Sequence, residues 1–234
     1  MATKRIFEDP DFGYVIVSSR RNARNISMRI RDNQLVVTVP PYAKISQVVD
    51  AVNKFSEPLL KNFKKVESKS FDENYMIDTP FFRLKIVVWN GINFRLNYKA
   101  DPILLECPKN TDFSSDEAKV LIRSGIVRAM KRQAAIILPP IVNEYVQRYG
   151  KKIRKIKITG ARSRWGSCSS AGTISLSCYL VLLPPHLVDY VILHELAHTE
   201  EMNHSDRFWA VLDGMTDGKS KSLRAELRKF KTEF

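Results

Sequence analysis

The chain has 234 residues, of which 44% are hydrophobic and 27% are charged, and its formal net charge is +13. This composition is typical of a globular protein with one large or two small domains, and it excludes a disordered tail or a fibre. No apolar run approaches the roughly 20 residues that cross a membrane, so the sequence predicts no membrane partner.

The first predicted elements are short strands followed by one helix. "ISMRI" and "LVVTV" alternate apolar and polar residues around the turn residues "RDNQ", so they predict a hairpin within 14–39. Apolar residues spaced three and four apart from Ile45 to Phe55 then predict a helix. Pro58 is expected to kink or restart this helix, and Leu59, Leu60 and Phe63 to continue its apolar stripe.

Strands return in residues 81–105. "FRLKIVVW" and "INFRLNY" flank Asn90-Gly91, a dipeptide that favours tight two-residue turns, and therefore predict a second hairpin. "ILLEC" adds a further strand, and the polar stretch "PKNTDFSS" then breaks the pattern. We place a domain boundary there, with a β-rich N-terminal domain containing one helix at 1–112 and a second domain at 113–234.

The second domain is expected to open on a long helix. Ser114 and Glu117 have the spacing of a capping box, and apolar residues follow at helical spacing to about Ile137. Pro139-Pro140 is expected to stop this helix, and "IVNEYVQRYG" is expected to form a second helical piece.

Three of the four histidines lie in the segment "HELAHTEEMNH". A helix that begins at Pro184-Pro185 is expected to carry His194, Glu195 and His198. Residues four apart on a helix are offset by about 40° and rise about 6 Å, so the two imidazoles are placed to share one zinc ion. Glu195 is placed to reach a water molecule rather than the metal, which suits a general base.

His204 is the expected third ligand. On a continuous helix it would lie about 280° away from His194, so the helix must end soon after His198 and the chain must turn back. Asn203 is the residue of this turn best able to adopt a left-handed conformation. A buried helix with hydrogen-bonded histidines is the alternative to a metal site. The competing third ligands are Glu200, Glu201, Asp206 and Asp213.

Strands are predicted between the long helix and the metal motif. Those in 152–183 surround a turn in "SCSSAG", and we expect an edge strand at 173–180. Trp165 and Gly166 are candidates for shaping a strand beside the metal, with a backbone edge that pairs with an extended peptide. A core tryptophan beside a tight turn is the alternative.

Positive charge is concentrated in the same region. No acidic residue occurs between Glu144 and Asp189, although many lysines and arginines do. Such a concentration of positive charge attracts nucleic acid, nucleotides or acidic proteins. The alternative is a basic surface that is only solvated. Arg162 and Arg164 are candidates for stabilising an oxyanion or holding a phosphate, with surface charge or a local ion pair as the alternative.

The cysteines bear on the compartment. Cys107, Cys168 and Cys178 are odd in number and have no CxxC spacing, which indicates free thiols in a reducing environment. The first residues contain no apolar segment typical of a secretory signal. We therefore expect a cytoplasmic protein.

"RSRWGSCSSAGTISLSCYLVLLPPHLVDYVILHELAHTEEMNHSDRFW" resembles the core of the YgjP-like metal-dependent hydrolases, zincin-like proteins related in motif to the SprT-like proteases. "SSRRNARNISMRIRDNQLVVTVPPYAK" also resembles the β-rich N-terminal region of that family. The resemblance covers most of the chain and is strongest over 162–209. Residues 66–112 match weakly, and Ser56 stands where a tryptophan is expected.

The resemblance implies an α+β fold, in which the β-rich N-terminal domain precedes a zincin-like catalytic domain with the HExxH helix beside a small sheet. It also implies one Zn²⁺ ion held by His194, His198 and His204, with Glu195 as general base.

Three functions follow as hypotheses. The first is a zinc metallopeptidase acting on a peptide or protein. The second is a metal-dependent hydrolase of nucleoside triphosphates, because the basic run beside the motif suits a phosphate. The third is a nucleic-acid-associated protease of the SprT-like kind, which only the charge of +13 supports.

Overall fold

The computed structural model describes residues 4–9, 13–31, 34–56, 70–232 and 234. The fold is α+β, as predicted, and the chain forms two compact units, 1–69 and 70–234. Among the described helices, none combines the length and the apolar character that crossing a membrane requires.

The N-terminal unit contains a four-stranded sheet and a helix. Its strands are β1 (Lys4–Asp9), β2 (Gly13–Ser19), β3 (Ser27–Arg31) and β4 (Gln34–Val39), in the order β1-β2-β4-β3. β3 and β4 pair antiparallel, which confirms the first predicted hairpin, whereas β2 and β4 pair parallel.

The predicted first helix is present as α1 (Ile45–Lys54). Only part of its apolar stripe is buried: Val48 and Val52 pack against Leu35 and Val37 of β4, while Ile45 remains exposed. The predicted continuation through Pro58, Leu59, Leu60 and Phe63 lies outside the described residues.

The second unit begins with another four-stranded sheet. Its strands are β5 (Met76–Asp78), β6 (Arg83–Trp89), β7 (Arg95–Asn97) and β8 (Ile103–Pro108), in the order β5-β6-β8-β7. The second predicted hairpin is therefore wrong, because β8 lies between β6 and β7 and pairs with both. Burial explains this order: Leu105 and Cys107 of β8 are buried at the centre, and the more polar β7 takes the edge.

The long helix α3 (Asp116–Arg148) begins where expected but continues further. Its N-cap is Ser115, whose hydroxyl accepts a hydrogen bond from the Ala118 N–H, one residue later than predicted. The predicted stop is also wrong, because Pro139 and Pro140 lie inside the helix. Interior prolines cost roughly 3 kcal/mol. Fully buried residues on either side, Leu138 and Val142, provide packing that offsets this cost.

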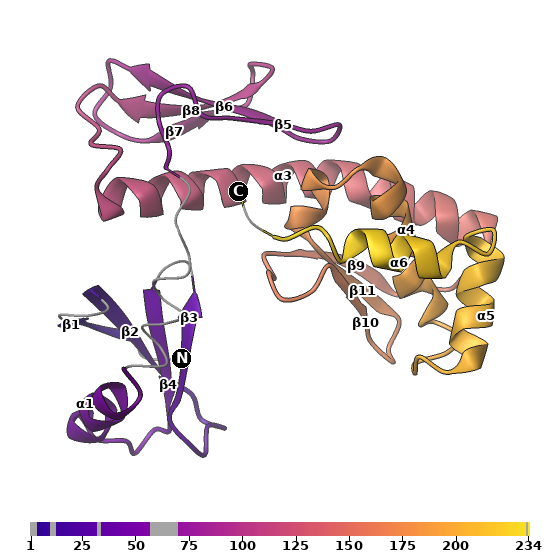
Figure 1. The fold of residues 1–234 in the computed structure, drawn as a ribbon, viewed down its shortest axis with the longest axis horizontal. Coiled ribbons are helices and arrows are strands. Elements are labelled where there is room, and N and C mark those ends of the chain that lie inside the picture. The colour runs from indigo at the N-terminus through magenta and orange to yellow at the C-terminus, as the bar shows by residue number, and fades with distance from the viewer. Residues whose placement is uncertain (1–3, 10–12, 32–33, 57–69, 233) are drawn as a thin grey trace. The chain divides into compact units, whose positions relative to one another are not determined.

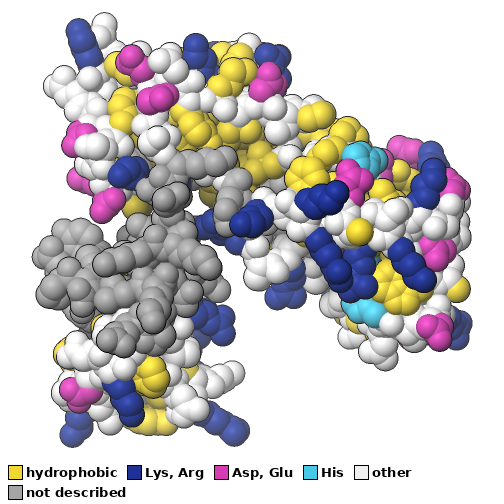
Figure 2. Space-filling view, in the orientation of Figure 1, with side chains coloured by type: hydrophobic (Ala, Val, Ile, Leu, Met, Phe, Trp, Pro, Cys, Tyr) yellow, Lys and Arg dark blue, Asp and Glu magenta, His cyan; other side chains and the backbone are white. Residues whose placement is uncertain are grey.

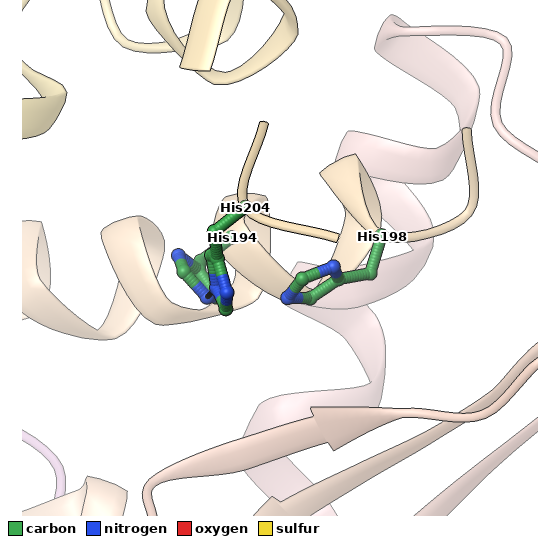
Figure 3. Close-up of side chains that lie close together, drawn as sticks. All are labelled: His194, His198 and His204. Carbon is green, nitrogen blue, oxygen red and sulfur yellow. Dashed lines mark hydrogen bonds between the residues drawn. The ribbon is translucent and has the colours of Figure 1, made fainter. Parts of the chain in front are cut away.

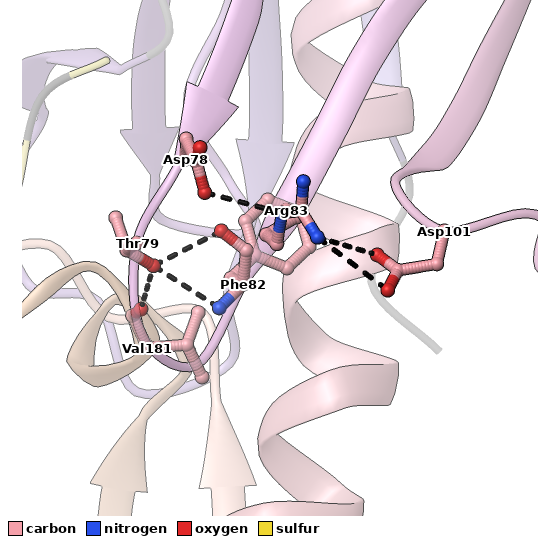
Figure 4. A network of polar contacts seen from close by, with 6 residues as sticks. All are labelled: Asp78, Thr79, Phe82, Arg83, Asp101 and Val181. Atoms are coloured by element: carbon pink, nitrogen blue, oxygen red, sulfur yellow. Dashed lines mark hydrogen bonds and ion pairs between the residues drawn. The ribbon is translucent and has the colours of Figure 1, made fainter.

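Figure 1 shows α3 running from the β5–β8 sheet to the strands and helices of the C-terminal half. Leu105 of β8 packs against Gly125 of α3, where an added Cβ would lie 2.9 Å from Leu105 Cδ1. The Thr79 hydroxyl lies 2.7 Å from the Val181 carbonyl oxygen and donates to it, which ties the β5–β6 connection to the C-terminal half (Figure 4). These contacts place 70–112 with 113–234, so the units divide at 69/70 rather than at the predicted 112/113.

The third sheet has three strands, β9 (Lys155–Thr159), β10 (Gly166–Cys168) and β11 (Thr173–Ser177). Its order is β10-β11-β9, with β11 antiparallel to β10 and parallel to β9. The expected edge strand at 173–180 is therefore wrong: β11 is central, and Cys178–Leu182 form a short 3-10 helix, η1. β10 is an edge strand instead. Three helices complete the unit: α4 (Pro185–Ala197), α5 (Asp206–Met215) and α6 (Ser220–Leu227).

Candidate metal centre and active site

Helix α4 positions the first two histidines and the glutamate. It begins at Pro185, where a missing N–H costs nothing, and most of its residues are buried apolar side chains. His194 and His198 lie one turn apart at its C-terminal end, with ring centroids 5.0 Å apart. The glutamate between them, Glu195, is only 5% exposed.

The chain reverses after α4, as predicted. The carbonyl of Ala197 accepts hydrogen bonds from the N–H groups of Glu200 and Glu201, and these bonds turn the chain out of the helix. Asp217 is the one non-glycine residue with a positive φ in the described chain, so the left-handed conformation expected for Asn203 is wrong. The turn needs no left-handed residue, because helix-type bonds at residues 199–201 already form it.

The reversal brings His204 to the other two histidines (Figure 3). The Nε2 atoms of His204 and His194 are 3.1 Å apart, and one nitrogen from each of the three rings lies within 4.8 Å of the others. Two ligands about 2.0–2.1 Å from a tetrahedral zinc ion are about 3.4 Å apart. The His194–His204 pair is close to this spacing, and the nitrogen of the third ring lies within 4.8 Å of both, so the three rings form a group that could hold one zinc ion.

Hydrogen bonding and burial prepare the imidazoles for a metal. His198 Nδ1 lies 3.0 Å from the Glu201 carbonyl oxygen, and donation from Nδ1 leaves Nε2 unprotonated. Burial, followed by the neighbouring His198 and His204, lowers the pKa of His194 to about 3, so its ring is neutral at physiological pH. Neutral imidazole is the form that binds zinc.

Phe208 of α5 packs against all three histidine rings. It is fully buried, and its ring centroid lies 4.9, 4.5 and 4.7 Å from those of His194, His198 and His204. The helix that carries it is capped by Ser205, whose hydroxyl accepts a hydrogen bond from the Phe208 N–H. The residue directly after His204 therefore fixes the aromatic side chain on which all three rings rest.

The side chain of Glu195 extends from α4 toward the edge strand β10. A Cβ added to Gly166 would lie 2.6 Å from Glu195 Oε1, so only glycine leaves room for the carboxylate. Burial raises the pKa of Glu195 to about 8, although the charge of Arg164 and a hydrogen bond from the Cys168 backbone act in the opposite direction. Its Oε2 atom is buried and has no hydrogen-bond partner among the described residues. A carboxyl group with a pKa near neutrality suits proton transfer at physiological pH.

A cleft of about 350 Å³ opens beside His194, His204 and Glu195. Two predicted substrate-binding residues, Trp165 and Gly166, line it. The other two, Arg162 and Arg164, line an adjoining cleft of about 260 Å³, which shares Trp165. All four candidates thus lie near the histidine cluster, but only Trp165 and Gly166 line the cleft that also contains His194 and Glu195.

The competing third ligands are not brought to the site. Glu200 forms an ion pair with Lys151, and Asp213 accepts a hydrogen bond from the Ser220 backbone. The three histidines form the sole metal-competent group of histidine, cysteine or acidic residues in the described chain. His186, which we did not expect to be a ligand, instead lies 2.9 Å from Glu226.

Sequence reasoning missed six residues that line the cleft: Tyr190 and Val191 of α4, Arg224 and Leu227 of α6, and Arg228 and Phe230 after it. Tyr190 precedes His194 by one helical turn, a spacing visible in the sequence. The spacing of Arg224 and Arg228 also predicts a shared helix face, but no local signal connects that face to the metal motif.

Comparison with known proteins identifies the family. The model of the YgjP-like metallopeptidase domain matches residues 24–230, and the chain belongs to this family. It is thus a metallopeptidase-family hydrolase, a class that uses a divalent metal ion and acts on peptides or proteins. The match includes 66–112, the segment whose resemblance is weak in the sequence.

Two solved structures are similar to part of the chain. The metallopeptidase zymogen abylysin of Pyrococcus abyssi is 22% identical over 40% of this chain and 95% of its own, with a TM-score of 0.36. The metallopeptidase zymogen jannalysin of Methanocaldococcus jannaschii is 26% identical over 39% of this chain and 93% of its own, with a TM-score of 0.35. No curated protein matches the chain.

Proposed function

We propose that this chain is a zinc metallopeptidase in which His194, His198 and His204 hold one Zn²⁺ ion and Glu195 is the general base. The observation that carries the proposal is the placement of Glu195. Its carboxylate is buried against Gly166 and lines a cleft open to substrate. Glu195 also directly follows His194, one of the three clustered histidines. The family match supports the peptidase over the nucleotide and nucleic-acid alternatives.

The chain supplies the proton transfers and the substrate alignment. Glu195 takes a proton from the attacking water and delivers it to the nitrogen of the leaving amine, so that an amide bond is replaced by a carboxylate and an amine. A zinc ion held by the histidines would act as a Lewis acid toward the substrate carbonyl group and the water. Gly166 begins β10 and Trp165 directly precedes it, and the outer edge of this strand is suited to pair with an extended peptide.

The activity test compares substrates of two classes. Full-length protein purified without a histidine tag and loaded with zinc is incubated with an unfolded protein, a broad peptide library and a panel of nucleoside triphosphates. We expect peptide cleavage that a chelator abolishes and zinc restores. Failure of the fully loaded protein to cleave any peptide would contradict the proposal, and phosphate release from a nucleotide in the same experiment would favour the alternative hydrolase.

The ligand assignment is tested by His204→Ala, with His186→Ala as the matched control. His204 supplies one of the clustered nitrogens, whereas His186 is the fourth histidine and lies outside the cluster. We expect His204→Ala to weaken zinc binding by more than the roughly 10–100-fold that loss of an outer-shell partner costs, and His186→Ala to leave it unchanged. Competition with a chromogenic chelator measures both, and equal zinc affinity in the two variants would exclude His204 as a ligand.

A further inference from the structure

One wall of the cleft is built by α6 and the residues after it. Arg224, Leu227, Arg228 and Phe230 line the cleft, which His194, His204 and Gly166 also line. The guanidinium carbon of Arg224 lies 5.0 Å from the centre of the Trp209 ring, and this contact holds the charge above an aromatic surface. The wall therefore presents two guanidinium groups alongside apolar side chains.

These charges are not neutralised within the described chain. Neither Arg224 nor Arg228 forms an ion pair with a described acidic side chain. The neighbouring acid on α6, Glu226, faces His186 instead. Glu195 is the one acidic residue among those that line the cleft, and it is buried.

The adjoining cleft extends the positive surface. Arg162, Arg164 and Lys231 line it, together with Trp165 and Phe230, which also line the first cleft. Figure 2 shows Lys and Arg side chains gathered over α6, next to a histidine. A ligand that runs along both clefts would meet basic side chains along its length and apolar contacts at Trp165 and Phe230.

We propose that the substrate is an acidic peptide whose carboxylate groups bind Arg224 and Arg228 while its backbone lies beside the reaction centre. This rests on the proposed peptidase activity and names its substrate class. Guanidinium groups pair with carboxylates through two parallel hydrogen bonds, which gives geometric selectivity as well as attraction. The apolar residues of the wall and the free edge of β10 suit an extended polypeptide better than a polyphosphate.

Binding is measured separately from cleavage. The probe is a fluorescein-labelled decapeptide with several Asp and Glu residues, and its reference replaces each of them with Asn or Gln. Each peptide is made with a free and with an amidated C-terminus, which separates side-chain carboxylates from the terminal one. Fluorescence anisotropy with zinc-loaded, full-length Glu195→Gln protein gives the dissociation constants.

The two arginines are then changed together. We expect the acidic peptide to bind about tenfold or more tightly than its amide reference, and Arg224→Ala with Arg228→Ala to remove this preference. Changing both to Glu should reverse the preference toward a lysine-rich peptide, which a merely structural role would not produce. Lys221→Ala with Lys229→Ala is the matched control: it removes two exposed charges from the same segment but none from the cleft, so the preference should persist.

The outcomes separate this inference from the proposed function. Equal affinity for the acidic and amide peptides overturns it, even when the wild-type protein cleaves both, which leaves the peptidase intact. Arginine-dependent binding of the acidic peptide supports the inference even when no peptide is cleaved, and the peptidase then fails instead. Arginine-dependent binding of a nucleoside triphosphate, without binding of either peptide, also overturns it. The ratio of wild-type kcat/KM for the two peptides repeats the test if the Glu195→Gln variant folds poorly.

Discussion

At the residue scale, the site depends on how closely Glu195 fits its surroundings. Its carboxylate lies against the backbone of Gly166, and it accepts a hydrogen bond from the Cys168 backbone. A glycine at this point of β10 is therefore required by the approach of a side chain from α4 rather than by a turn. The sequence motif identifies the glutamate, whereas the glycine that admits it lies 29 residues earlier in the chain.

Gly166→Ala tests this fit. The added Cβ would fall 2.6 Å from Glu195 Oε1, so the carboxylate must move away from its present position. Because a displacement of about 1 Å can cost about 100-fold in rate, we expect kcat to fall by roughly that factor while zinc content stays the same. Peptide hydrolysis and metal analysis on the same sample measure both quantities.

The control is Gly214→Ala on α5, where an added Cβ has no atom within 4 Å. Alanine is favoured over glycine inside a helix by about 0.5–1 kcal/mol, so this variant should be active and slightly more stable. Wild-type activity in Gly166→Ala would show that Glu195 does not need its observed position.

At the element scale, the sequence predicts elements that depend on neighbouring residues well. It predicts the pairing of strands that are far apart in the sequence less well. The HExxH helix, the β3–β4 hairpin and the reversal before His204 all follow from residues close together in sequence. The second hairpin fails because Asn90-Gly91 signals a turn, but not that β8 will enter between the two strands. Arg224 was missed as part of the site for the same reason, since only tertiary packing brings α6 to the histidines.

Helix α3 shows how packing overrides a local stop signal. Pro140→Ala tests the energetic cost, because Pro140 is exposed and its ring can be removed without opening a cavity. Alanine restores an N–H that can donate to the carbonyl oxygen of Ile136, one turn earlier. We expect the free energy of unfolding to rise by about 1–3 kcal/mol in urea denaturation. A decrease would mean that the proline ring itself stabilises the helix.

At the scale of the whole molecule, the division into two units assigns the β5–β8 sheet to the unit that contains the metal centre. The core of 70–234 runs continuously from Leu84 and Leu105 of that sheet, through Ile126 of α3, to Leu193 of α4. The N-terminal unit has a separate core around Leu35 and Val37. The boundary predicted from the sequence lies 43 residues after the observed one at 69/70, because the polar stretch before α3 resembles a linker.

Fragments test this division. A fragment of residues 70–234 retains its whole core cluster, so we expect it to unfold cooperatively and to bind zinc as the full chain does. A fragment of 113–234 lacks the sheet that packs on α3 and should be unfolded or aggregate. Circular dichroism and zinc titration distinguish them. Cooperative folding of 113–234, together with zinc binding, would restore the boundary suggested by the sequence.

In the proposed mechanism, Glu195 acts in catalysis without holding the metal. The most direct measurement is therefore zinc content and peptide hydrolysis on one sample of Glu195→Gln, made alongside the wild-type protein. Glutamine has nearly the same size, but it cannot accept the proton from water. We expect one zinc ion per chain in both proteins and a loss of turnover of roughly 100- to 10,000-fold in the variant. Turnover at the wild-type rate with zinc fully bound would contradict the account.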